Sequence, residues 1–420
     1  MKAILRDERE MKDSGIDWIA YIPNNWKVNV LFQVTSQVKN KNLELKEQNL
    51  LSLSYGKIKR KDINTNEGLL PASFENYNIV EKDDIVLRLT DLQNDHKSLR
   101  VGHVNERGII TSAYVTLHPN VFINSNYLYY VLHMFDLKKG FYGMGAGVRQ
   151  GLTYDEVKTL KICYPSMLEQ QAIANYLDDR CSKIDTIIAE AKASIEEYKE
   201  LKQAVIDKYI LGYNDIHIKL NRLGSLKNGL NFTHFEENGN IKFLGVGCFK
   251  DNTILSKEDS FENIHIDFEI DDEYLLINGD IIFVRSNGSK DLVGRSIMVD
   301  NITFPLTYSG FCIRFRNQHT EIVDSKFLLY YFRTSYFKES LLKHSNDSTN
   351  INNLNQGMLN AIRISAPIKN EQLMVIEKLE KKLCTMEDVI SEKQSLIEDL
   401  EAYKKSLIYE VVTGKRKVVA

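Results

Sequence analysis

The chain has few of the residues that interrupt or crosslink a fold. Only six of its 420 residues are proline and 22 are glycine, which leaves no room for a long low-complexity linker. The cysteines are odd in number and none forms a CxxC pair. This pattern argues against a disulfide framework or a zinc site and favours a reducing cytosol, so we expect a cytoplasmic protein without a bound metal. The five cysteines are Cys163, Cys181, Cys248, Cys312 and Cys384.

Long apolar runs and catalytic patterns are also missing from the sequence. No apolar run approaches the roughly 20 residues of a membrane helix. The charged N-terminus, MKAILRDEREMKDSG, lacks the apolar region of a signal peptide. The patterns HExxH, GxxxxGK[ST] and GxSxG are absent, and so are the DPPY- and NPPF-type motifs of amino-methyl transfer. We therefore expect no catalytic residue in this chain taken by itself.

Two weak patterns have a functional interpretation that we do not favour. The glycines of residues 143–148 suggest a phosphate loop, but the GxGxxG spacing is missing and a plain loop is the better interpretation. Glu156 and Lys158 resemble the ExK tail of restriction nucleases, a pattern too common to indicate an active site alone. The net charge of -3 argues against a surface that binds nucleic acid everywhere, but permits one basic face.

What the sequence does contain is a long internal repeat. Residues 165–170 match residues 367–372, a shift of 202, and the ungapped match continues as far as Gly212 and Gly414. Upstream the match is looser, with residues 84–88 resembling 280–285. A period this long indicates duplicated domains. Each consists of a globular part, in which the two copies match loosely, followed by a helical part, in which they match closely.

The helical parts show apolar residues at heptad spacing, which predicts a coiled-coil seam between two antiparallel helices. Pro165 and Pro367 stand before the helices, and Gly212 and Gly414 stand where each should end. The alternative is two amphipathic helices in an ordinary core. The predicted seam consists of Leu177, Ile184, Ile188, Ile195 and Tyr198 in the first helix, and Leu379, Met386, Ile390, Ile397 and Leu400 in the second.

The expected fold class is α+β, with two mixed α/β domains joined by two long antiparallel coiled-coil helices in a pseudo-two-fold arrangement. Strands are predicted at residues 84–89, 109–117, 280–285 and 311–315, and helices at 126–135 and 325–332. The expected segments are a first globular domain at 1–164, the first helix at 165–213, a second globular domain at 214–366, the second helix at 367–414 and a tail at 415–420. Such helices would hold the two globular domains at a fixed spacing, which in a DNA reader would set the distance between two half-sites.

Basic and polar residues cluster in both globular parts. Arginine and lysine can pair with guanine, asparagine and glutamine with adenine, and serine and threonine with phosphate. A solvated polar surface is the alternative for any one cluster. The candidate DNA-binding residues are Tyr55, Lys57, Lys59, Arg60, Lys61, Arg88, Thr90, Asn94, Lys97, Arg100, Arg149, Gln150, Lys250, Arg285, Ser286, Asn287, Ser289 and Lys290.

Residues 15–26 resemble the N-terminal signature of the specificity subunits of type I restriction-modification enzymes. The glycine stretch with Arg149 that leads to Pro165, Glu169 and Gln170 is similar to the same family, and so is its repeat at 367–372. This sequence departs from the family's pattern at two places. Ala20-Tyr21 replaces the family's frequent Gly-Glu, and Ile351 stands 202 residues beyond Arg149, so the arginine is not duplicated.

The resemblance implies two target recognition domains that read a bipartite site in double-stranded DNA. It also implies assembly with two modification (methyltransferase) subunits and with motor-nuclease restriction subunits, which would handle S-adenosylmethionine, ATP and Mg²⁺. The candidate positions for docking these partner subunits are four apolar residues outside the seam, Ile173, Leu201, Val375 and Tyr403. The competing hypotheses are a protein-binding coiled-coil scaffold with two non-catalytic heads and a self-contained nuclease.

Overall fold

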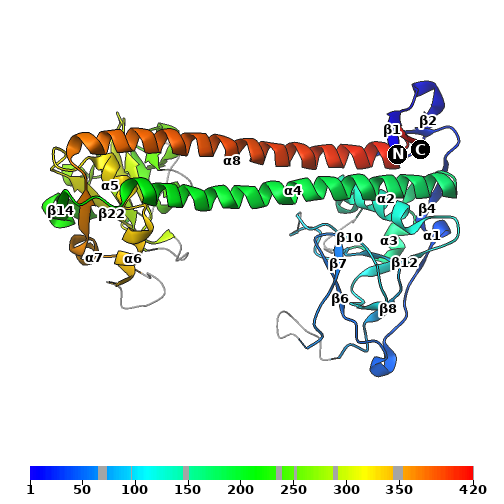
Figure 1. Cartoon of the computed structure of the whole chain (residues 1–420). Helices are drawn as coiled ribbons and strands as arrows, with labels where there is room; N and C mark the ends of the chain where they lie inside the picture. The colour runs from blue at the N-terminus through cyan, green and yellow to red at the C-terminus, as the bar shows by residue number, and fades with distance from the viewer. Residues whose placement is uncertain are drawn as a thin grey trace. The chain divides into compact units, whose positions relative to one another are not determined.

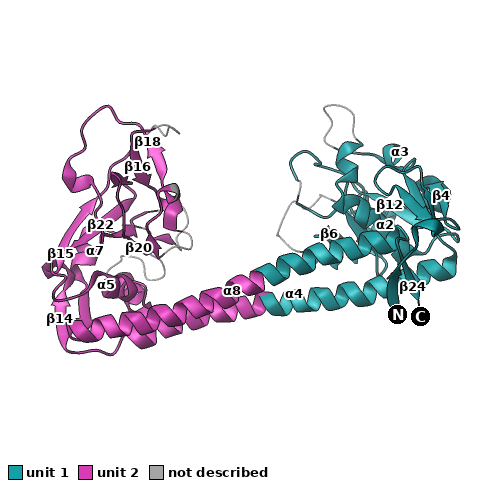
Figure 2. Ribbon diagram, turned by 90° about the horizontal axis from the view of Figure 1, so that it is seen from above, with its two compact units in different colours: residues 1–191, 395–420 teal, residues 192–394 magenta. Residues whose placement is uncertain are grey.

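Two long helices dominate the computed structural model of the chain (Figure 1). Helix α4 (Met167–Ile210) and helix α8 (Lys369–Val412) each have 44 residues. The structure describes residues 1–64, 73–95, 97–144, 151–232, 239–249, 253–286, 292–343 and 353–419. It divides into two compact units, and the boundary between them falls within both helices. Unit 1 comprises residues 1–191 and 395–420, and unit 2 comprises residues 192–394 (Figure 2).

The ends of both helices lie where the prolines and glycines predict. Each helix begins two residues after its proline, Pro165 or Pro367. Gly212 and Gly414 follow the C-termini with φ of +96° and +72°, a backbone region that suits glycine. A Cβ atom on Gly414 would lie 2.5 Å from the ring of Pro23. The second glycine is therefore required by close packing as well as by its backbone angle.

Within each unit the two helices run antiparallel, as expected. In unit 1, Lys404 of α8 donates to Asp185 of α4 at 2.6 Å, and in unit 2 Lys202 of α4 donates to Glu387 of α8 at 2.7 Å. These ion pairs join the first half of one helix to the last half of the other. Seven of the predicted seam residues are buried, while Tyr198, Ile390 and Leu400 are half-buried.

The seam is not separate from the heads. In unit 2, Leu379 and Met386 belong to one hydrophobic core with Phe327 and Leu328 of the head. The coiled-coil interpretation and the core interpretation therefore both hold for this part of the seam. The long helices are structural members of each unit as well as links between them.

The head of unit 1 is built on a four-stranded antiparallel sheet in the order β10-β9-β12-β5. Smaller antiparallel pairs surround it, and helix α2 (Ser125–Leu137) contacts β10. The strands of this unit are β1 (Lys2–Leu5), β2 (Met11–Asp13), β3 (Tyr21–Pro23), β4 (Lys27–Val30), β5 (Thr35–Gln37), β6 (Leu51–Ser54), β7 (Lys57–Arg60), β8 (Asn78–Val80), β9 (Ile85–Leu87), β10 (Val101–His103), β11 (Gly108–Ile110), β12 (Val115–Pro119), β13 (Lys161–Tyr164) and β24 (Arg416–Val419), and its short helices are α1 (Leu31–Val34) and α3 (Tyr154–Val157).

The head of unit 2 has a five-stranded sheet in the order β15-β22-β19-β20-β17 and a three-stranded sheet in the order β18-β16-β21. Strand β14 pairs with β23 as β4 pairs with β13 in unit 1. The strands are β14 (Ile216–Lys219), β15 (Gly224–Asn228), β16 (Ile241–Leu244), β17 (Ile254–Leu255), β18 (Glu262–Ile264), β19 (Ile281–Val284), β20 (Ser296–Val299), β21 (Leu306–Tyr308), β22 (Cys312–Asn317) and β23 (Arg363–Ala366), and the helices are α5 (Ser325–Tyr331), α6 (Ser335–Lys343) and α7 (Gln356–Ala361).

The α+β class with two mixed heads is confirmed, and one predicted strand is wrong. The single strand expected at 109–117 is two strands, because a turn at residues 111–114 redirects the chain from β8 to β9. The expected tail at 415–420 contains β24, which pairs along its length with β1. The other predicted strands and helices occur within three residues of their expected bounds.

A buried glutamine fastens each long helix to its own head. Gln170 of α4 is 1% exposed, and its side chain accepts from the Asn124 N–H at 2.7 Å and donates to the carbonyls of Phe122 and Pro165. These three bonds satisfy the amide and fix the start of α4 against the start of α2.

The same fastening is repeated in unit 2. Gln372 of α8 is fully buried and accepts from the Asp324 N–H at 2.8 Å. It donates to the carbonyls of Ile322 and Pro367 at 3.0 and 2.8 Å. The glutamine of the sequence repeat is therefore a structural residue, and its partners in both units are main-chain atoms.

Candidate DNA interface

The first basic cluster lies on a tight hairpin of unit 1. Strands β6 and β7 are joined by Tyr55 and Gly56, which both have positive φ, the backbone of a type I′ turn. Tyr55 is 80% exposed at the tip, and Lys57 is exposed beside it. The hairpin therefore presents an aromatic ring together with cations, a combination suited to phosphates and bases.

The arginine of this cluster is already engaged. Lys59 and Lys61 are exposed, but the Nε of Arg60 donates to both carboxylate oxygens of Glu106 at 2.7 and 2.8 Å. The ion pair with Glu106 is the first cause of a raised pKa for the Arg60 guanidinium. The exposed lysines are thus the more accessible cations of the hairpin.

Arg100 does not lie on the surface. Its side chain is fully buried, and it donates to the carbonyls of Thr90 at 2.6 Å and Asp91 at 3.2 Å and to the hydroxyl of Tyr142 at 3.0 Å. A guanidinium with no exposed surface cannot contact DNA in this conformation. The sequence prediction for Arg100 is corrected: its fork of donors holds together the loop that follows β9.

The loop held by Arg100 carries the other candidates of the cluster. Asp95 accepts from the backbone of Lys97 and Ser98, and hydrogen bonds from Ser98 lower the pKa of this carboxyl to about 2. Arg88 is 30% exposed and lies 3.6 Å from the same carboxylate. Asn94 and Lys97 are exposed and Thr90 is half-buried. The loop is therefore held by its own hydrogen bonds, and Asn94 and Lys97 are its exposed candidates.

Two further candidates of unit 1, Arg149 and Gln150, lie outside the described residues. The residues that follow them are anchored to the same loop. Leu152 N–H donates to the carbonyl of Leu89 at 2.9 Å, and a Cβ on Gly151 would lie 3.0 Å from that oxygen. This close approach of two backbones favours glycine there, since a Cβ atom would need the neighbouring carbonyl to shift.

In unit 2 the described candidates are few. Arg285 and Ser286 are half-buried at the end of β19. Phe311, which sequence analysis missed as a surface residue, is 57% exposed and its carbonyl accepts from the Arg285 N–H at 2.7 Å. The strand predicted at 311–315 gave no sign of this exposure, because Phe311 resembles the buried residues that follow it. Outside the described residues lie Lys250, Asn287, Ser289 and Lys290.

The two basic loops are not in the same register. Arg88 N–H donates to the carbonyl of Arg100, and Val284 N–H donates likewise to the carbonyl of Arg295. Arg88 therefore corresponds to buried Val284, and Arg285 stands one residue further along. The match of Arg88 with Arg285 expected from the sequence is wrong.

An aspartate at the start of β9 and β19 is shared by the heads. Asp84 and Asp280 are each 1% exposed, and each accepts from the N–H three residues earlier in its own turn. Asp84 also bonds to Nδ1 of His118 at 2.6 Å, whereas Asp280 accepts two bonds from Arg316 at 2.9 and 2.7 Å. The carboxylates brace the strands that lead to the candidate loops.

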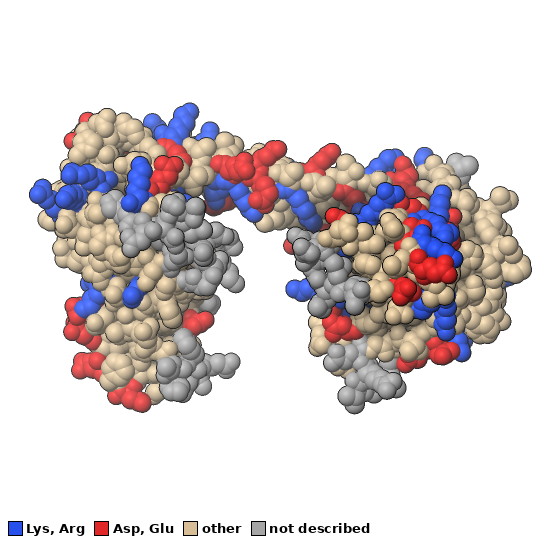
Figure 3. Space-filling model, turned by 90° about the horizontal axis from the view of Figure 1, so that it is seen from below, with Lys and Arg blue, Asp and Glu red and all other residues tan. Residues whose placement is uncertain are grey.

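The weak catalytic patterns have structural explanations. Glu156 accepts from the Thr153 N–H at 2.6 Å and so caps α3, and Lys158 pairs with Asp155 at 2.6 Å. Within the described ranges no group of three or more His, Cys, Asp or Glu side chains could hold a metal ion. The same residues include no helix that could span a membrane. On the face shown in Figure 3, acidic and basic side chains are interspersed.

The proposed docking positions divide into two kinds. Ile173 is 1% exposed, so the prediction that it docks a partner is wrong. Val375 is half-buried against the core of unit 2. Leu201 and Tyr403, which stand 202 residues apart, are 49% and 55% exposed on α4 and α8. Of the four positions offered for docking, Leu201 and Tyr403 are the exposed ones.

The fold defines a class of protein: two α/β heads of related plan, each fastened to paired helices. Residues 23–197 and 217–393 match the family described as the type I restriction modification DNA specificity domain. The chain therefore belongs to this family, and the family domain occurs twice in it.

Curated relatives agree with this assignment. The StySPI specificity subunit of a type I restriction enzyme from Salmonella potsdam is 27% identical over 296 residues, covering 66% of this chain and 62% of that protein. The EcoKI specificity subunit from Escherichia coli K12 is 28% identical over 108 residues, 26% of this chain and 22% of that protein. The chain thus spans less than two thirds of the length of these relatives.

Solved structures share the fold. A chain from a study of complex assembly and conformational transition of the type I R-M system covers 94% of this chain and 99% of its own length, with a TM-score of 0.72 and 12% identity. The HsdS subunit from Thermoanaerobacter tengcongensis covers 94% and 98%, with a TM-score of 0.53 and 13% identity. At such identities the likeness concerns the fold alone.

Proposed function

We propose that this chain selects the DNA sequence on which a type I restriction-modification enzyme acts, with each head reading one half of a bipartite site. The observation that carries this proposal is the occurrence of the DNA specificity domain in both halves. The heads add support, since the buried strands β9 and β19 each lead into a polar stretch of sequence, and the two stretches differ in their residues. Different loops on a shared frame suit two different half-sites.

In this proposal the chain itself carries out no chemistry. Two modification subunits transfer methyl groups from S-adenosylmethionine, and restriction subunits use ATP and Mg²⁺. Two copies of one partner need two equivalent surfaces, and exposed Leu201 and Tyr403 occupy equivalent positions of the repeat. We expect L201D and Y403D each to reduce the bound modification subunits from two to one, as measured by mass photometry. Retention of both copies in each variant would contradict this docking site.

The reading function is tested by mapping methylated bases in a host with and without this gene. Exchange of residues 214–366 for those of another specificity subunit should change one half-site and leave the other unchanged. A scaffold with protein-binding heads would leave the methylated sequence untouched. A DNA reader loses affinity for DNA steeply as the salt concentration rises, whereas such a scaffold would show no salt-dependent DNA affinity.

We further propose that the long helices fix the spacer between the half-sites. Each has 44 residues, and a helix rises about 1.5 Å per residue. Insertion of four residues in each helix should lengthen the spacer of the methylated site or abolish methylation. Methylation of the original site with its original spacer would contradict this role.

A further inference from the structure

The turn that precedes β12 in unit 1 recurs before β22 in unit 2. In unit 1 the Ala113 N–H donates to the Thr111 hydroxyl at 3.3 Å, and the next N–H donates to the Thr111 carbonyl at 3.2 Å. In unit 2 the Phe311 N–H donates to the Ser309 hydroxyl at 3.2 Å, and the next N–H donates to the Ser309 carbonyl at 2.8 Å. Position 113 of unit 1 therefore corresponds to position 311 of unit 2.

The side chain on this shared turn differs between the heads. Ala113 and Phe311 are both exposed, and Phe311 is 57% exposed. A single exposed apolar residue needs no special explanation. Unlike side chains on the same exposed turn are, however, what two heads that distinguish different half-sites require.

The turn lies at the end of the sheet where the polar stretch of each head begins. Val284 at the end of β19 pairs with Cys312 at the start of β22. The Arg285 N–H, one residue further on, donates to the Phe311 carbonyl at 2.7 Å. In unit 1 the end of β9 pairs with the start of β12 in the same way. Phe311 is therefore a direct neighbour of a cationic residue that is itself a candidate for DNA binding.

The backbone that carries Phe311 is held from several sides. The Gly310 N–H donates to the Leu230 carbonyl at 2.8 Å, and a Cβ atom on Gly310 would overlap the side chain of Asn231. The hydrogen bond from Arg285 constrains the other side of the turn. A side chain on a constrained turn loses little backbone freedom when it binds a partner, which favours recognition.

A second exposed phenylalanine of unit 2 provides a contrast. Phe268 is 60% exposed and stands between the exposed residues Asp267 and Glu269, and residues 271–273 are exposed and acidic too. Carboxylates at this density repel the phosphates of DNA. Of these two phenyl groups, that of Phe311 is thus the one whose surroundings suit DNA.

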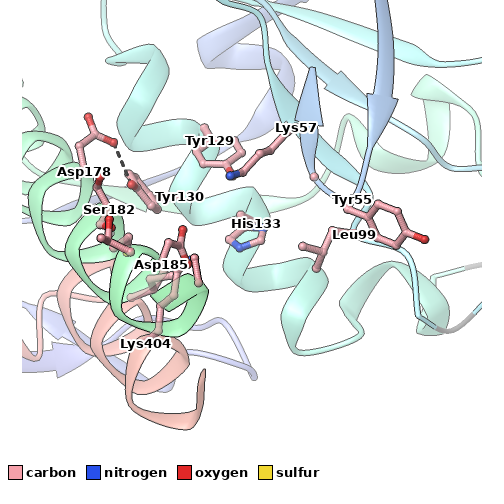
Figure 4. Close-up of a pocket in the computed structure, with 15 residues that line it drawn as sticks. Tyr55, Lys57, Leu99, Tyr129, Tyr130, His133, Asp178, Ser182, Asp185 and Lys404 are labelled. Carbon is pink, nitrogen blue, oxygen red and sulfur yellow. Dashed lines mark hydrogen bonds and ion pairs between the residues drawn. The ribbon is translucent and has the colours of Figure 1, made fainter. Parts of the chain in front are cut away.

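Unit 1 has its exposed aromatic ring on a different turn. A Cβ atom on Gly56 would lie 3.0 Å from Leu99, so the β6–β7 turn with Tyr55 adjoins the loop that follows β9. Figure 4 shows the Tyr55 ring beside Leu99 and directed away from His133 and Lys404. Each head therefore has an exposed aromatic ring next to the segment after β9 or β19, on turns that are not equivalent.

We propose that Phe311 recognises the methyl group of a thymine in the half-site that unit 2 reads, an inference that rests on the proposed function. A phenyl group has no hydrogen-bond donor or acceptor for a base edge. Among the groups that base pairs display in the grooves, the thymine methyl is the apolar one. Ala113 offers only a methyl group on the same turn, so the two heads read this position of their half-sites differently.

The experiment measures binding of the full chain, as purified from its host, to duplexes that carry the mapped methylation site. Each thymine of the two half-sites is replaced in turn by deoxyuridine, which pairs identically but lacks the methyl group. At one position of one half-site the replacement should weaken binding about fourfold, the factor that corresponds to burial of one methyl group. Phe311→Ala should bind the thymine and deoxyuridine duplexes equally there. Phe311→Leu, which keeps an apolar side chain on the turn, should retain part of the difference.

The matched control is Phe268→Ala, which removes a similarly exposed phenyl group from the same head. It should keep the full difference between thymine and deoxyuridine. Urea denaturation of each variant verifies that it is folded. Since Phe311 is more than half exposed, F311A should unfold at nearly the same urea concentration as the wild type.

Three results would overturn the role of Phe311 while the reading function stands. One is sequence-specific binding by the wild type without a deoxyuridine effect in either half-site, and another is an effect that folded F311A retains. The third is a rise in 2-aminopurine fluorescence on binding that F311A loses without any deoxyuridine effect, which would indicate a ring inserted between bases. If the wild-type chain prefers no DNA sequence, the proposed function fails and this inference fails with it.

Discussion

The two units agree where a head meets its helices and differ where a head meets solvent. Gln170 and Gln372 make the same three hydrogen bonds, and Lys404–Asp185 repeats as Lys202–Glu387. By contrast, the segments that follow β9 and β19 differ in register, since Arg88 corresponds to Val284 and not to Arg285. The two units thus share the contacts between head and helix and differ at their surfaces, as the proposed reading of two unlike half-sites requires.

The largest expected effect comes from removal of the buried glutamine that holds each helix to its head, and the comparison predicts an equal loss of stability in the two units. Q170A and Q372A each leave a buried amide N–H and two carbonyls with fewer partners, at a cost of about 3 kcal/mol in the free energy of unfolding. The two losses should agree within about 1 kcal/mol, as measured by urea denaturation. The control is Q171A, an exposed neighbour, with an expected change of about 0.5 kcal/mol or less. Unequal losses from Q170A and Q372A would show that the two fastenings are not equivalent.

A substitution in the head of unit 1 tests whether each head recognises its own half-site. Arg100→Lys should destabilise unit 1 by about 2–3 kcal/mol, because one ammonium cannot reach the several acceptors that the guanidinium holds. DNA recognition should weaken at one half-site and remain normal at the other. Methylation of DNA substrates with either half-site altered measures this. If both half-sites weaken equally, the loop does not belong to one reading surface.

The buried aspartates offer a finer comparison. Asp280→Asn leaves Arg316 without its carboxylate and should cost about 2 kcal/mol, reduced by the partial exposure of that arginine. Asp84→Asn should cost less, since burial raises the pKa of Asp84 and its charged form is already disfavoured. Urea denaturation of both variants at pH 7 measures the difference. A larger loss for D84N would contradict it.

The raised pKa of Asp84 also predicts a pH dependence. The folded state binds a proton at Asp84 more tightly than the unfolded state, so this carboxyl makes unfolding less favourable as pH falls through its raised pKa toward 3.8. D84N should lack this contribution. The measurement is the free energy of unfolding of wild type and D84N across that pH range. Parallel curves for the two proteins would assign the pH dependence to other groups.

The smallest expected effect concerns one exposed cation. Lys59→Ala should weaken DNA binding uniformly over sequences by well under tenfold and reduce the slope of log affinity against log salt by about one. The control is Glu44→Ala, which removes an exposed charge of the other sign on the same head. Fluorescence anisotropy at several salt concentrations measures the slope. An unchanged slope would show that Lys59 does not contact the DNA phosphates.

The sequence predicted the repeated parts well because their causes are local. Proline before each helix, glycine after it and heptad apolar residues between them determine where α4 and α8 begin, end and pair. The turn at residues 111–114 was missed because apolar residues on both sides read as one strand. Arg100 was misassigned because its partners, Thr90, Asp91 and Tyr142, come together only in the folded head. A basic residue in a polar stretch has the same sequence pattern whether it faces DNA or the backbone.

The two glutamines have a consequence for how such heads can change over time. Every atom that Gln170 and Gln372 bind in the heads is a main-chain nitrogen or oxygen, which all amino acids possess. A foreign head with a similar backbone path would therefore be accepted by the same helix, whatever its side chains. Recombination between genes could then replace the reading part of the molecule in a single event, and its partners would meet an unchanged framework.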